Sequence, residues 1–110
     1  MSRFLCVHTV PSNAFTREQV RELTQAAQQD PEIRGYRSFL NLSEGKIACI
    51  MEGPSREAVM AWFDKMGVPY DWVAKVELEG ERGNILEEGK GEQIGQTPDW
   101  LRSSSHTTPS

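Results

Sequence analysis

Three side chains in the sequence have the chemistry of a binding site: the imidazole of His8, the guanidinium of Arg37 and the carboxylate of Glu52. An imidazole transfers protons near neutral pH, and a neighbouring carboxylate raises its pKa. A guanidinium pairs with a carboxylate through two parallel hydrogen bonds, so an arginine also suits a small carboxylate ligand. If the fold brings them together, these residues predict a proton-transfer centre or a small-anion site.

A β-hairpin over residues 35–55 is expected to bring two of these side chains together. Two alternating runs of apolar and polar residues flank a short turn, which is typical of antiparallel strands. If Ser43 pairs with Lys46, the same register sets Arg37 directly opposite Glu52. One face of the hairpin would then be mostly apolar, and the other would carry a charge pair.

Two helices are predicted around the hairpin. The first opens at Thr16, because Thr16 and Gln19 fit the S/T-x-x-E/Q capping box. Apolar side chains then recur at helical spacing until the Asp-Pro pair at 30 and 31 ends the helix. The second helix opens at residue 54 or 55, and Gly67 suits its C-terminal end.

Further strands at residues 4–10 and 72–79 complete the order βαββαβ. This order predicts a ferredoxin-like α+β domain over residues 1–79, with a four-stranded antiparallel sheet of order 4-1-3-2 and both helices on one face. Residues 80–110 are rich in Gly, Glu, Ser and Thr. We expect them to form a polar, largely extended or disordered tail.

The sheet face away from the helices is expected to hold the site. The parity of each strand assigns twelve residues to this open face: Phe4, Cys6, His8, Arg37, Phe39, Asn41, Ala48, Ile50, Glu52, Val73, Lys75 and Glu77. Half of them are apolar, so we expect two copies to pack face to face as a homodimer that encloses a small cavity. His8, Arg37 and Glu52 would lie side by side in it, with Lys75 on its wall.

Composition excludes several classes of protein. The formal charge is -4 with no basic patch, so nucleic-acid binding is not expected. No apolar run approaches the roughly 20 residues of a membrane span, and the N-terminus lacks the features of a secretory signal. We therefore expect a cytoplasmic protein with no membrane partner. Cys6 and Cys49 lie within predicted strands and are expected to stay reduced there.

Four segments carry a family resemblance: RFLCVHTVP, TREQV, RSFLNLSEGKIACIMEGPSREAV and MGVPYDWVAKVE, which together span residues 3–79. The most specific part is C-x-x-E-x-P at Cys49, Glu52 and Pro54. This pattern resembles a family of small bacterial ferredoxin-like proteins of unknown function whose best-characterised type is a nickel-binding protein. The resemblance implies a dimeric α+β barrel, and nickel as the metal of that type.

Members of that family commonly carry histidine at the positions of Arg37 and Trp62. Neither residue supplies an imidazole, and a guanidinium repels a cation. We therefore expect no cofactor and no retained nickel site. If a metal were bound, His8 and Glu52 would be its candidate ligands.

These features predict a small ligand-binding protein more than an enzyme. The ligand would be a small anion or carboxylate, bound by His8, Arg37, Glu52 and Lys75 in the cavity of the homodimer. Two alternatives stay open. One is an isomerase or monooxygenase of the dimeric α+β barrel type with His8 as its catalytic acid or base, and the other is a transition-metal binding module.

Overall fold

The computed structural model describes residues 1–87 and 93–94, and the chain divides into a first unit, Met1–Val76, and a second unit from Glu77 onward. The first unit holds six elements in chain order: β1 (Ser2–Thr9), α1 (Arg17–Gln29), β2 (Arg34–Asn41), β3 (Lys46–Gly53), α2 (Arg56–Met66) and β4 (Trp72–Lys75). No helix among the described residues is long and apolar enough to cross a membrane.

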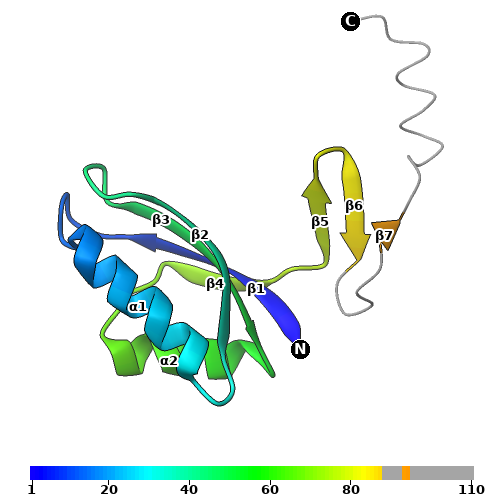
Figure 1. Cartoon of the computed structure of the whole chain (residues 1–110), viewed down its shortest axis with the longest axis horizontal. Helices are drawn as coiled ribbons and strands as arrows, with labels where there is room; N and C mark the ends of the chain where they lie inside the picture. The colour runs from blue at the N-terminus through cyan, green and yellow to red at the C-terminus, as the bar shows by residue number, and fades with distance from the viewer. Residues whose placement is uncertain (88–92, 95–110) are drawn as a thin grey trace, which may run out of the picture. The chain divides into compact units, whose positions relative to one another are not determined.

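The four strands of the first unit form an antiparallel sheet in the order β2-β3-β1-β4, and α1 and α2 lie together on one of its faces (Figure 1). Read from its other edge, this is the order 4-1-3-2. The first unit is therefore an α+β fold of one sheet and one helical layer, as the ferredoxin-like pattern predicts.

Local sequence determines where the helices begin and end. The Thr16 side chain accepts a hydrogen bond from the backbone N–H of Gln19, and the Gln19 side chain accepts one from the N–H of Thr16. This confirms the predicted capping box. Ser55 caps α2, and Gly67 ends it with a φ of 72°, the left-handed conformation that glycine adopts most readily.

The hairpin register differs from the predicted one. Arg37 pairs with Ile50, and Glu52 pairs with Arg34, so Arg37 and Glu52 do not face each other. The closing pair is Asn41 with Lys46, and the register shifts again at a bulge between Gly35 and Arg37. The side chain of Asn41 accepts a hydrogen bond from the backbone N–H of Glu44 and so stabilises a loop longer than the predicted turn.

Strand β1 presents the opposite face from the one predicted. Phe4, Cys6 and His8 are buried beneath the helices, whereas their neighbours Leu5 and Val7 lie on the open face. The same inversion holds for β4, where Val73 is buried and Trp72 is 48% exposed. Apolar side chains occupy both faces of these strands, so their alternation alone does not say which face meets the helices.

The second unit begins with a β-hairpin where an extended tail was expected. Strands β5 (Leu78–Glu81) and β6 (Asn84–Glu87) pair antiparallel, and β6 pairs with β7 (Gln93–Ile94). The two turn residues, Arg82 and Gly83, have φ values of 50° and 88°, which is typical of a tight hairpin turn. The predicted strand 72–79 is thus split after Lys75, and the rest of the expected tail lies outside the described residues.

Candidate functional site

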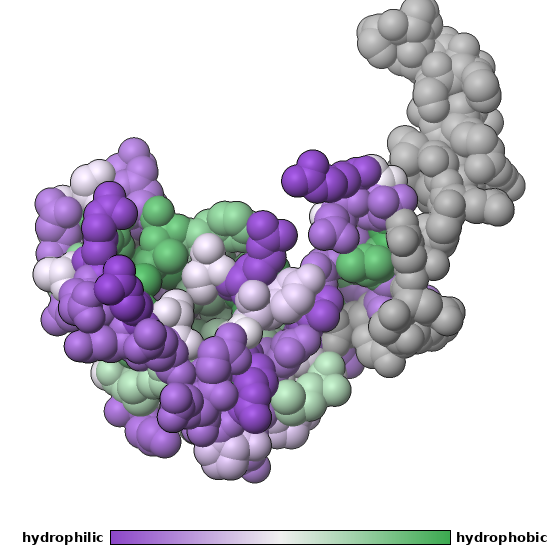
Figure 2. All heavy atoms as spheres, viewed as in Figure 1, coloured by the Kyte–Doolittle hydropathy of each residue, from purple (hydrophilic) through white to green (hydrophobic). Residues whose placement is uncertain are grey.

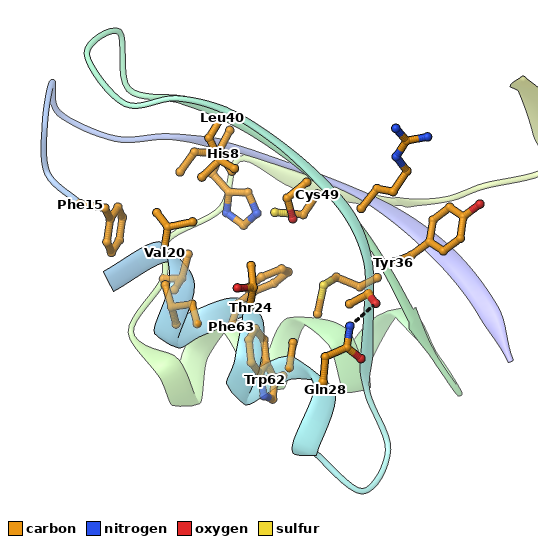
Figure 3. A pocket seen from close by; sticks show the side chains of 18 residues that line it. His8, Phe15, Val20, Thr24, Gln28, Tyr36, Leu40, Cys49, Trp62 and Phe63 are labelled. Atoms are coloured by element: carbon orange, nitrogen blue, oxygen red, sulfur yellow. Dashed lines mark hydrogen bonds between the residues drawn. The ribbon is translucent and has the colours of Figure 1, made fainter. Parts of the chain in front are cut away.

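A cavity of about 360 Å³ lies within the first unit, between α1 and the hairpin β2–β3 (Figure 3). Its floor is formed by β1 and α2. The wall is mostly apolar and includes Val20, Leu23, Leu40, Ile47, Trp62 and Phe63. The cavity therefore offers a small ligand a mostly apolar surface with few polar contacts.

His8 supplies the most deeply buried polar group of this wall, with 1% of its side chain exposed. Its Nδ1 lies 2.7 Å from the carbonyl oxygen of Pro69. A carbonyl oxygen only accepts hydrogen bonds, so Nδ1 carries the proton and Nε2 of the neutral ring is an acceptor. Within the part of the chain that the structure describes, this buried Nε2 has no hydrogen-bond partner.

The surroundings of His8 hold its ring in place and favour the neutral form. Burial lowers the pKa of His8, while the bond to the Pro69 carbonyl and the nearby Asp71 carboxylate oppose that effect. The rings of His8 and Phe63 pack edge to face, with their centroids 4.7 Å apart. His8 thus holds a fixed, unpaired lone pair within the cavity wall.

Cys49 lies on the same sheet face as His8, one strand away and diagonally displaced, because Cys6 pairs with Cys49 and His8 pairs with Ile47. Burial raises the pKa of the Cys49 thiol, and a hydrogen bond from Ser38 opposes this shift. Burial, together with the neighbouring Cys49, raises the pKa of Cys6 to about 12. Both cysteines are free thiols, and neither is ionised at neutral pH.

The predicted group of His8, Arg37 and Glu52 does not form. Glu52 lies on the open face, where its carboxylate is 2.9 Å from Nε of Arg3. Arg37 contributes to the cavity wall, but its guanidinium carbon stands 5.3 Å from the ring centre of Phe39, on the open face. His8 lies on the other face, toward the helices, because side chains on successive residues of a strand point to opposite faces.

The pairing of β1 with β3 and β4 also shows where the other predicted site residues lie. His8 and Glu52 lie on opposite faces of the sheet, so this pair cannot bind one ion. Lys75 is exposed on β4, where it pairs with Phe4, and it does not line the cavity. Among the described residues, no group of three or more His, Cys, Asp or Glu side chains is placed to hold a metal ion.

The cavity itself was not predicted, although its polar edge has a sequence signal. Thr24 and Gln28 are polar residues at helical spacing from the apolar Val20, and all three line the cavity. The Gln28 side chain donates a hydrogen bond of 2.9 Å to the Gly35 carbonyl, which links α1 to β2 at one end of the cavity (Figure 3). Interrupted apolar patterns on a core-facing helix are the signal that points to such a site.

The open face of the sheet is a second surface of interest. Phe39, 58% exposed, and Trp72 lie there with the partly buried Leu5, Val7 and Ile50. Figure 2 shows apolar residues gathered over the sheet on the side away from the helices. Arg3 and Glu52 form an ion pair on the same face, and the Arg3 guanidinium stacks 3.9 Å from the ring centre of Tyr36.

Comparisons with known proteins cover this first unit. A model of the family described as nickel responsive protein SCO4226-like matches residues 4–76. The crystal structure of SCO4226 from Streptomyces coelicolor A3(2) is similar to this chain, with a TM-score of 0.62 and 27% sequence identity over 72% of this chain and 100% of that chain. A comparison with curated proteins finds no match. The family match includes every residue that lines the cavity.

Proposed function

This chain belongs to the family of SCO4226-like nickel-responsive proteins, and we propose that it binds a small, mostly apolar molecule in the cavity between α1 and the β2–β3 hairpin. The observation that carries this proposal is the cavity itself. The cavity opens to solvent where Thr24, Gln28 and Leu40 are exposed. Its volume of about 360 Å³ falls in the range of small-molecule sites.

The lining favours a neutral ligand over the small anion that the sequence suggested. A charged group would lose its hydration against an apolar wall, and this cost is large without a paired opposite charge. The guanidinium of Arg37 lies over Phe39 on the open face, and the Glu52 carboxylate already pairs with Arg3. The ligand best suited to the wall is therefore a compact hydrocarbon or aromatic body.

A filled-cavity variant tests the proposal. Thr24 and its neighbour Gln25 are both exposed on α1, but only Thr24 lines the cavity. At about ten times its Kd, p-xylene should stabilise the native protein by about 1.4 kcal/mol, which raises Tm by roughly 5 °C. Thr24→Phe should abolish this shift, and Gln25→Phe should retain it. A wild-type Tm that p-xylene does not change would refute the proposal.

We also propose that two copies associate through the open face. Contiguous exposed apolar side chains on a sheet are typical of an interface, and a two-fold axis would pair this face with itself. The cavity lies on the helical side, so such a dimer would not enclose it. The dimer and the ligand site are thus separate properties of the chain.

Nickel binding is the rival function, and the description of the family supports it. In this chain the lone pair of His8 Nε2 offers one donor atom, and the Cys49 thiol on the same sheet face is a candidate partner. A Ni²⁺ ion requires more donors than this pair supplies. Calorimetric titration with NiCl₂ separates the two functions, because binding that His8→Asn and Cys49→Ala both abolish would favour nickel at this site.

A further inference from the structure

We propose that the ligand of the cavity carries one uncharged hydrogen-bond donor, a hydroxyl or N–H group on a flat aromatic body, and that this donor binds Nε2 of His8. The inference rests on the proposed function and names the class of ligand that the cavity accepts. Phenols, aromatic alcohols and aromatic amines belong to this class.

The unpartnered nitrogen is the first step. Nδ1 of His8 donates to the Pro69 carbonyl, which leaves Nε2 as an acceptor, and the side chain is 1% exposed. Buried polar atoms in proteins almost always have a partner, and an unsatisfied one destabilises the fold. Nε2 is buried within the cavity wall, so it gains a partner when a donor on the bound molecule displaces the atoms that cover it.

Water is a poor substitute for that molecule. A buried water is held by two to four polar partners. The Thr24 hydroxyl donates to the carbonyl of Arg21, and the Gln28 amide donates to that of Gly35. The thiol of Cys49 is only a weak donor or acceptor. The cavity therefore favours a ligand that brings one donor and is otherwise apolar.

A carboxylate is equally poorly matched. Its oxygen atoms accept hydrogen bonds, and they would face a second acceptor at Nε2. The two thiols on this face are neutral and offer an anion no positive charge, and the Arg37 guanidinium lies over Phe39. No described side chain on the wall near His8 carries a positive charge that could pair with an anion. The cavity is therefore expected to bind the carboxylate that the sequence suggested more weakly than a neutral ligand.

The shape of the wall favours an aromatic body. Phe63 contacts His8 edge to face, and Trp62 contacts Phe63 in the same way, with ring centroids 5.5 Å apart. Figure 3 shows His8 on the sheet side of the cavity and Phe63 and Trp62 on the helix side. Flat rings pack against such edges and faces in offset or T-shaped arrangements. An aromatic ring with its donor directed at Nε2 uses both features at once.

Three probes of nearly equal size test the inference: p-cresol, p-xylene and 4-methylbenzoate. The first two differ only by a hydroxyl in place of a methyl group, and the third adds a negative charge. At pH 8, titration calorimetry on the full chain should give p-cresol an affinity about tenfold or more above that of p-xylene. The affinity of 4-methylbenzoate should be the weakest of the three.

Two variants assign the preference to His8. His8→Asn keeps an N–H near the Pro69 carbonyl but removes the acceptor at the Nε2 position, and His8→Phe removes both groups. In each variant the advantage of p-cresol over p-xylene should fall to about twofold or less, while Gln25→Ala, at an exposed residue that does not line the cavity, should keep it in full. Circular dichroism of each variant establishes that the fold is retained.

A measurement on the wild-type protein tests the contact with Nε2 without any substitution. The ¹⁵N chemical shift of His8 Nε2 should change when p-cresol binds and stay in place when p-xylene binds. Equal affinities for p-cresol and p-xylene, or an unchanged Nε2 resonance with bound p-cresol, would overturn the inference and leave the proposed function standing. Failure of all three probes to bind would overturn both.

Discussion

His8 is a buried imidazole whose two nitrogens have different roles. Nδ1 is tied to the Pro69 carbonyl, and Nε2 is left to the cavity. The sequence predicted this histidine as a candidate site residue, but it placed the side chain beside Arg37 and Glu52. The residue type indicated what chemistry His8 could do. Its neighbours depend on which face of β1 meets the helices, and the sequence does not decide this because both faces of β1 are apolar.

The burial of His8 makes the stability of the protein depend on pH. Unfolded imidazole takes up a proton near pH 6.5, and the native ring does so only at lower pH, since burial lowers the pKa of His8. Between these values the unfolded state binds more protons, so the free energy of unfolding rises with pH. This stability is fully present above about pH 6.5 and is lost as the pH falls toward the native pKa.

Urea denaturation between pH 5 and 8 measures this effect. The other groups near His8 are the carboxylate of Asp71 and the thiols of Cys6 and Cys49, and these thiols keep their protons over that range. The wild-type protein should lose stability below about pH 6.5, and His8→Asn should lose less. Equal slopes for the two proteins would show that His8 does not titrate in this way.

At the scale of elements, the sequence predicted helix ends well and strand registers poorly. The capping box at Thr16 and the glycine at 67 are local signals, and both appear as predicted. The hairpin register depends on the loop that Asn41 stabilises and on the bulge before Arg37. A two-residue slip leaves the side-chain alternation unchanged, so the sequence pattern could not detect it.

Gly45 ties the hairpin loop to the end of β1. Its φ is 70°, its carbonyl accepts a hydrogen bond from the Val10 N–H, and a Cβ at this position would collide with the Val10 carbonyl oxygen. Gly67 has a φ of 72° with open space around it. The two glycines therefore share the same left-handed backbone conformation. They differ in that only a Cβ at Gly45 would collide with a neighbouring atom.

Substitution by alanine at both positions separates these causes. Gly67→Ala should cost about 1–2 kcal/mol of stability, the penalty of a left-handed residue. Gly45→Ala should cost about 1–3 kcal/mol more, because the Val10 backbone must move. Chemical denaturation of both variants measures the difference, and equal costs would contradict the close approach of the loop to β1.

At the scale of the whole molecule, the open sheet face and the cavity lie on opposite sides of the first unit, so the proposed dimer and the proposed ligand site are separate. The sequence predicted the four strands and two helices of this unit and a half-apolar open face, but it placed there Phe4, Cys6 and Val73, which are buried beneath the helices. It did not predict the cavity, because a void arises from how far α1 stands from the hairpin. That spacing depends on side chains packed from four elements, not on the pattern of any one of them.

The association of two copies is tested by charge placed on each side of the sheet. Phe39→Glu puts a carboxylate on the open face, and Ala61→Glu puts one on an exposed position of α2. Sedimentation velocity at micromolar concentration should find dimers for the wild type and for Ala61→Glu, and monomers for Phe39→Glu. A wild-type monomer would refute the proposed interface.

The most direct test of the ligand site is an NMR titration of ¹⁵N-labelled protein with p-xylene. Backbone amides around the cavity, in α1, the β2–β3 hairpin and the segment of α2 near Phe63, should shift together with one dissociation constant. The open-face residue Trp72 and the second unit should not change. Shifts confined to the open face, or no saturable shift at all, would contradict a ligand site in the cavity.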